Sequence, residues 1–149
     1  MWNSRKSILL SKICTLIFLA AVLIVLITAP WIMDWAVHRS ISILPEHKPF
    51  FLITIYSGGV LACILLIRLY QLLHNISKEQ AFVSKNISLL RQISWVCYGG
   101  GIIAFVSAIY YQPWGFVCVA AAFVGLIIRV IKNIMQQAIM IKEENEFTI

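Results

Sequence analysis

Four long apolar runs dominate the hydropathy pattern of the chain. They lack the apolar–polar alternation of a membrane β-strand, and each approaches the length of about 20 residues that a helix needs to cross a bilayer. The expected spans cover residues 13–33, 50–73, 93–110 and 114–131. Lipid offers the backbone no hydrogen-bonding partner, so each span must satisfy its own amides as a helix. The pattern therefore predicts an all-α polytopic membrane protein with four transmembrane helices in one domain, residues 1–149.

The segment 74–92, between the second and third spans, has an amphipathic pattern. The run Ser77-Lys78-Glu79-Gln80 fits a capping box, in which the first side chain bonds forward and the fourth bonds back. One helical face then carries Val83, Ile87, Leu90 and Ser94. We expect an amphipathic helix here, which either lies at the membrane surface or receives a protein partner.

The last segment, residues 132–149, continues the helical pattern of the fourth span and ends in an acidic tail. Glu143, Glu144 and Glu146 are three of the six acidic residues in the chain. Anionic lipid would not hold such a tail, which leaves it available to a protein partner. The alternative is a frayed, solvated terminus.

Composition and charge support a membrane location and predict an orientation. The chain is 61% hydrophobic and 12% charged, whereas soluble domains have about 45–50% apolar and about 25% charged residues. Of the 12 Lys and Arg residues, only Arg39 and Lys48 lie between the first and second spans, and none lies between the third and fourth. Short loops rich in Lys and Arg stay in the cytoplasm, so both termini and the segment 74–92 are predicted to be cytoplasmic, with the protein in the plasma membrane. The net charge of +6 is scattered along this face and suits anionic lipid; we expect no direct nucleic-acid binding.

Small residues at four-residue spacing predict where the helices pack, because they let backbones approach closely in lipid. These stripes lie in the last three spans and comprise Gly58 and Ala62, then Gly100, Ala104 and Ala108, then Ala121 and Gly125. Packing within the bundle is the favoured interpretation. The same stripes could instead pair two copies of the chain in a homo-oligomer.

No arrangement of residues predicts a catalytic, cofactor-binding or metal-binding site. The sequence has no nucleophile–base set, no phosphate-binding loop and no paired carboxylates within a span. Its four cysteines fall in or near the spans without CxxC spacing, which is typical of small packing residues. We therefore expect a protein that is not an enzyme.

Residues 82–93 and the closing residues 142–149 together resemble the bacterial membrane proteins grouped as domain of unknown function 2975. Members carry a phenylalanine–polar–asparagine–leucine–arginine stretch before the third of four spans, and the residues that match it here are Phe82, Asn86, Leu90 and Arg91. Lys85 stands where an acidic residue is expected, and Ser94 where glycine is common. The resemblance extends over essentially the whole chain. In this family the gene often lies beside one for a small helix-turn-helix regulator, which implies a membrane partner for a DNA-binding protein.

The leading hypothesis is a non-enzymatic regulatory or sensor protein of the membrane that binds a cytoplasmic helix-turn-helix transcription regulator. Its partner-binding residues are expected to be Phe82, Asn86, Leu90, Arg91, Glu143, Glu144, Glu146 and Phe147. The alternative is a small transporter subunit, or an immunity-type protein that acts in the bilayer on a bacteriocin or another peptide.

Overall fold

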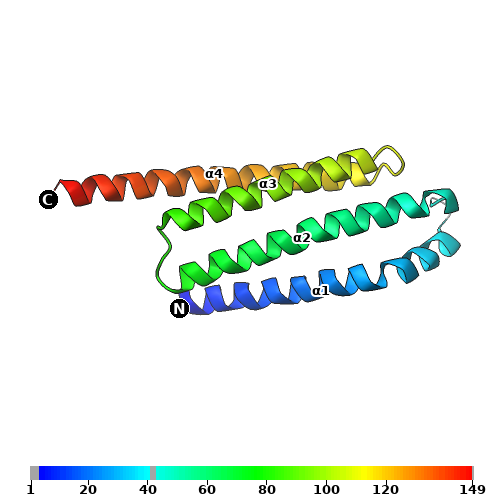
Figure 1. Ribbon diagram of the computed structural model, residues 1–149, viewed down its shortest axis with the longest axis horizontal. Helices are drawn as coiled ribbons and strands as arrows, with labels where there is room; N and C mark the ends of the chain where they lie inside the picture. The colour runs from blue at the N-terminus through cyan, green and yellow to red at the C-terminus, as the bar shows by residue number, and fades with distance from the viewer. Residues whose placement is uncertain (1–3, 41–42, 149) are drawn as a thin grey trace.

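The computed structural model describes residues 4–40 and 43–148, which form four long helices that run alternately up and down (Figure 1). The helices are α1 (Ser4–Arg39), α2 (Lys48–Ser77), α3 (Ser84–Ser107) and α4 (Trp114–Phe147), with a short 3₁₀ turn, η1 (Pro45–His47), before α2. Each of the four is long and apolar enough to cross a membrane. The predicted all-α class with four spans is confirmed.

The helices extend beyond the apolar runs that predicted them. Residues 74–77 are the last turn of α2, and residues 84–92 are the first turns of α3. The helix expected in the segment 74–92 thus begins only at Ser84 and is continuous with the third span, whereas residues 78–83 form a turn. The predicted capping box is wrong, because Ser77 ends α2 and its Oγ donates to the carbonyl oxygen of His74 at 2.7 Å. Hydropathy marks the part of a helix that lies in lipid, whereas the backbone hydrogen bonds continue past it.

The end of α3 and the start of α4 agree better with the boundaries predicted from the sequence. α3 ends at Ser107, before the expected limit of 110, and α4 begins at Trp114 directly after Pro113. Proline fits at a helix start because the N–H group that it lacks would have no partner there. α4 then continues without a break to Phe147, so residues 132–147 are one helix with the fourth span.

The helices pack in chain order, α1 on α2, α2 on α3 and α3 on α4. No comparable packing joins α1 to α4 in the described part of the chain, so one flank of the bundle stays open. The accessible surface is 10393 Å², whereas a compact soluble protein of this size exposes about 7,700 Å². Much of the excess is Ile, Leu, Val and Phe along the helices, a surface suited to lipid contact.

Both termini lie at one end of the bundle, together with the turn at 78–83 (Figure 1). This end, called the basic end below, holds ten Lys and Arg residues and four Glu residues. The other end holds two basic and two acidic residues. The whole net charge of +6 is therefore at the basic end.

A cluster of hydroxyl and aromatic groups closes the end away from the basic end. The Oγ1 of Thr54 lies 2.7 Å from both the Oγ of Ser107 and the hydroxyl of Tyr110. Ser107 also donates to the carbonyl of Ile103, and Tyr110 to that of Phe50. The three hydroxyl groups thus make four polar contacts, which tie the start of α2 to the end of α3. An ion pair between Lys48 and Asp34 joins α2 to α1 nearby.

The α3–α4 interface contains a close approach between the two helices. The Oγ of Ser94 donates to the carbonyl of Gly125 at 3.1 Å, and both residues are buried. A Cβ on Gly125 would lie 3.0 Å from the ring of Tyr98 and 3.1 Å from the Cβ of Cys97. Gly100 is different, because a Cβ there would have no atom within 4 Å.

These two glycines give a matched test of the packing. G125A should lower stability by about 1–3 kcal/mol, because its methyl group overpacks the interface. G100A should leave stability unchanged or raise it by up to about 1 kcal/mol, because alanine favours a helix over glycine. Thermal unfolding of the purified variants in detergent measures both. Equal destabilisation by the two substitutions would contradict this packing.

Candidate functional site

The turn between α2 and α3 is built from backbone hydrogen bonds that end α2. The N–H of Gln80 donates to the carbonyl of Asn75 at 3.2 Å, and that of Glu79 to the carbonyl of Ile76 at 3.1 Å. This pair of bonds is a Schellman motif, which needs one residue in the left-handed region. Glu79 occupies that position with a φ of 61°. The turn therefore reverses the chain sharply at the basic end.

The side chain of Asn86 connects this turn to the start of α3 through hydrogen bonds. It is 0% exposed, and its Nδ2 donates to the carbonyls of Gln80 at 2.7 Å and Ala81 at 2.8 Å. Its Oδ1 accepts a hydrogen bond from the Nδ2 of Asn75 at 2.9 Å. Both donors of the amide are thus used, and one side chain joins the end of α2, the turn and α3. We call this arrangement the Asn86 latch.

The four residues that match the family stretch do not form one surface. Asn86 faces the turn, and Leu90 lies in the buried cluster of Leu72, Leu89, Leu90, Ile93 and Cys97. Phe82 is 55% exposed, and Arg91 is exposed on the outer side of α3. The buried face of α3 includes Asn86, Leu90, Ile93 and Ser94. The apolar face expected from the sequence shares Leu90 and Ser94 with it but has Ile87 in place of Asn86, which lies inside the protein.

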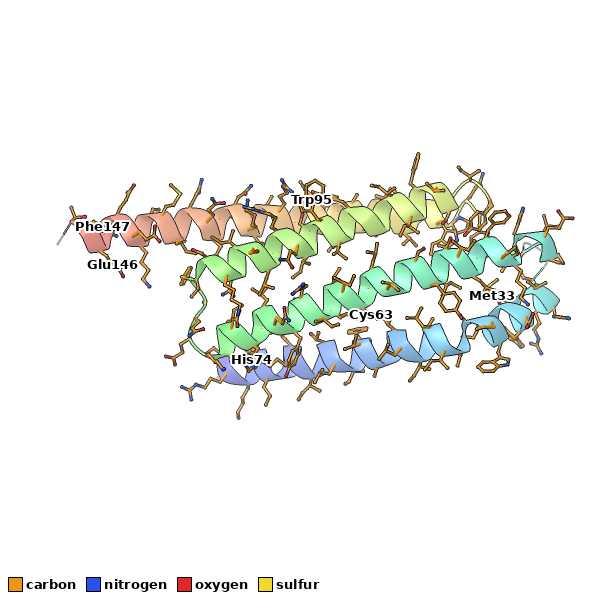
Figure 2. The ribbon with its side chains drawn as sticks, viewed as in Figure 1. Met33, Cys63, His74, Trp95, Glu146 and Phe147 are labelled. Carbon is orange, nitrogen blue, oxygen red and sulfur yellow. The ribbon has the colours of Figure 1, made fainter. Side chains whose placement is uncertain are left out.

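The other predicted partner-binding residues lie on the free end of α4. Every residue from 140 to 148 is exposed, and Figure 2 shows Glu146 and Phe147 beyond the start of α3. Met140, Glu143, Glu144 and Phe147 share one helical face, since they are three or four residues apart. We call residues 140–147 the α4 extension. Its carboxylates and exposed apolar side chains face away from the rest of the chain.

A polar groove runs between the last turns of α2 and the first turns of α3, with a volume of about 580 Å³. One wall carries Arg68, Gln71 and Asn75 of α2 at helical spacing, and the other carries Lys85, Ser88 and Gln92 of α3. His74 also lines it, with its ring stacked on that of Tyr70 at 6.4 Å; Figure 2 places His74 near the end of α2. We call this the basic groove. Sequence reasoning missed it, because its two walls come from different helices.

An apolar cavity of about 420 Å³ lies among all four helices, toward the end away from the basic end. Five of the small residues that were predicted to pack helices together instead line this cavity: Gly58, Ala62, Gly100, Ala104 and Ala121. Phe18 and Val25 of α1 and Val117 of α4 form its rim and are exposed. The cavity therefore opens on the flank where α1 and α4 do not pack together. Ala108 lies outside it and is partly buried, and Gly125 packs on α3 as described above.

Residues 42–149 match the family model described as "Protein of unknown function (DUF2975)". The chain belongs to the DUF2975 family. No curated protein and no solved structure matches it. The match leaves out residues 1–41, so the family resemblance, expected over essentially the whole chain, is shown for α2, α3 and α4 and not for α1. The Asn86 latch, the basic groove and the α4 extension all fall inside the matched part of this DUF2975 protein.

Two polar contacts of this DUF2975 protein, one made by Asn86 and one by Ser94, could have been predicted from the sequence. Asn75 and Asn86 flank the turn, and a buried amide on an apolar helix face needs hydrogen-bonding partners. Ser94, where the resemblance led us to expect glycine, donates to α4 instead. Within residues 4–40 and 43–148, no group of three His, Cys, Asp or Glu side chains could hold a metal ion.

Replacing Asn86 tests the latch. N86A should lower the free energy of unfolding by about 2–3 kcal/mol, because it removes the three hydrogen bonds that the fully buried amide of Asn86 makes. N133A removes the same side chain from an exposed position of α4, and its effect should stay below about 0.5 kcal/mol. Thermal unfolding in detergent compares the two variants. An N86A protein as stable as N133A would show that the latch does not hold the turn.

Proposed function

We propose that this protein is a non-enzymatic regulatory protein of the plasma membrane that binds a cytoplasmic helix-turn-helix transcription regulator. Both termini then lie in the cytoplasm, as the distribution of Lys and Arg predicts. The regulator is held at the membrane by the α4 extension and is released when the bundle responds to a signal. The observation that carries the proposal is the exposure of the whole α4 extension beyond the rest of the bundle.

The length of α4 supports a partner in the aqueous phase. The helix continues for about 16 residues past the expected end of its span at residue 131, a rise of about 24 Å. The headgroup layer on one side of a bilayer is only about 5–8 Å thick. The α4 extension therefore passes beyond the headgroups, where Phe147 is 91% exposed.

The charge of the α4 extension supports a basic partner. It contains Glu143, Glu144 and Glu146 against a single Lys142, while the rest of the basic end is strongly positive. Anionic lipid repels this acidic segment. DNA-binding proteins carry basic surfaces, and the face of Met140, Glu143, Glu144 and Phe147 offers such a surface two carboxylates between two apolar side chains.

Two of the residues expected to bind the partner, Asn86 and Leu90, have a different role in this proposal. Asn86 and Leu90 support the turn and the core, so they act on a partner only through the position of α3. Phe82 and Arg91 remain exposed and can add contacts at the rim. The main partner-binding residues are then Glu143, Glu144, Glu146 and Phe147.

Capture of a purified regulator tests this function. The full-length protein in native membranes should retain the helix-turn-helix regulator whose gene the family resemblance implies beside its own, and the double variant E143K/E144K should lose that retention at least tenfold. E46K reverses the charge of one carboxylate at the other end of the bundle and should retain the regulator normally. Because the regulator is cytoplasmic, retention also tests the orientation. No retention by the unchanged protein, or equal loss with E46K, would refute the proposal.

The apolar cavity supports a second candidate function, a small transporter subunit or a peptide-immunity protein. Its volume of about 420 Å³ falls in the range of about 300–1,000 Å³ that ligand pockets occupy. Its opening between α1 and α4 faces the lipid phase, where lipophilic compounds and membrane-active peptides accumulate.

A pair of glycine substitutions tests this second candidate. A Cβ would have no atom within 4 Å at either Gly100 or Gly115, but only Gly100 lines the cavity. G100L should abolish any uptake or resistance that the protein confers, because leucine fills the cavity, while G115L should preserve it. The measurement is growth of cells with each variant at graded concentrations of the compound or peptide. Equal activity of both variants would exclude the cavity as the site.

A further inference from the structure

We propose that the basic groove binds the phosphate headgroup of an anionic phospholipid. The groove is separate from the α4 extension and from the apolar cavity, and the inference does not depend on the regulator. The geometry, the charge and the depth of the groove each support it.

The groove has two facing polar walls with an apolar floor. Arg68, Gln71 and Asn75 recur along α2 at intervals of three and four residues, and Lys85, Ser88 and Gln92 repeat that spacing along α3. The Nη1 of Arg68 donates to the Oε1 of Gln71 at 3.1 Å, which orients the guanidinium group. Leu89 lies between the walls and belongs to the buried core. A ligand with several acceptor oxygens can therefore contact both helices at once.

The charge of the groove is positive and unpaired. Arg68 and Lys85 line it, and none of its lining residues is Asp or Glu. The two ion pairs found among the described residues are Arg5 with Glu79 and Lys48 with Asp34, so neither groove cation has a carboxylate partner there. The guanidinium group is well suited to phosphate oxygens. The groove thus offers donors and positive charge to an anion.

The depth of the groove matches the headgroup layer. Arg68 lies about 20 residues along α2 from Lys48, a rise of about 30 Å, which is the thickness of the hydrocarbon core. With Lys48 at one interface, Arg68 lies at the other. From Arg68 to Asn75 the groove continues outward for about 10 Å. Basic pockets between helices at this depth receive the headgroups of anionic lipids.

The bound lipid would act on the same turn as the Asn86 latch. Asn75 lines the groove and also donates to Asn86, and Leu89 joins the groove to the core cluster. A headgroup that contacts both Arg68 and Lys85 holds α2 against α3. The lipid should therefore stabilise the folded protein.

Thermal unfolding of the purified full-length protein in a neutral detergent, with native mass spectrometry of bound lipid, tests the proposal. Phosphatidylglycerol should raise the melting temperature and remain bound, while phosphatidylcholine with the same acyl chains should do neither. R68Q/K85Q should weaken phosphatidylglycerol binding at least tenfold. R91Q/K78Q removes one Arg and one Lys outside the groove and should change binding less than threefold.

A third variant covers the case in which R68Q/K85Q does not fold. S88E keeps both cations and adds a carboxylate at an exposed position of the groove, so it should weaken phosphatidylglycerol binding by a similar factor. The proposal is overturned if phosphatidylcholine binds equally well, or if R91Q/K78Q weakens binding as much as R68Q/K85Q. It is also overturned if S88E binds phosphatidylglycerol normally, or if inorganic phosphate alone gives the same stabilisation, which would indicate a soluble phosphate ligand.

Discussion

The hydrogen bonds of the Asn86 side chain are the interaction on which the rest of the bundle depends. α3 is the one helix of the described chain that packs extensively on both α2 and α4 and holds most of the buried residues. Its first turn is fixed by an amide that bonds to Asn75, Gln80 and Ala81. Fixing that turn sets the register of α3, which places Ile93 in the core and Ser94 opposite Gly125. The alignment of the α2–α3 and α3–α4 interfaces therefore depends on the side chain of Asn86.

The number, class and approximate place of the helices follow from the sequence, because the cost of exposing backbone to lipid leaves few alternatives. Pro113 likewise accounts for the start of α4 at Trp114. The sequence could not show where each helix ends outside the lipid, so the segment 74–92 was assigned to one loop although it contains the last turn of α2 and the first turns of α3. Asn86 was expected to contact a partner because a polar side chain next to an apolar face gives no sign of its burial, and it is fully buried. Small residues were recognised, but spacing alone does not separate Gly125, which packs on α3, from Gly100, which lines a cavity.

The two ends of the molecule differ in the physical forces that act there. At the end away from the basic end, short-range contacts join α2 to the end of α3. They are made by the hydroxyls of Thr54, Ser107 and Tyr110 and by the rings of Phe50 and Phe51. At the basic end the charged side chains are mostly cationic, and their interactions extend to the lipid headgroups and the water beyond. The α4 extension departs from this pattern, since it is acidic where its surroundings are basic. Within the basic end, a responsive region is expected at the α4 extension, where every residue is exposed.

The flank between α1 and α4 determines how any molecule reaches the apolar cavity. In the second proposed function, the opening faces acyl chains rather than water, so a compound would arrive by lateral diffusion within the bilayer after it has partitioned from the aqueous phase. Occupancy then depends on the concentration dissolved in the membrane, which for a hydrophobic compound exceeds the aqueous concentration by its partition coefficient. A weak intrinsic affinity is therefore sufficient for high occupancy, and changes in lipid composition alter that occupancy without any change in the protein.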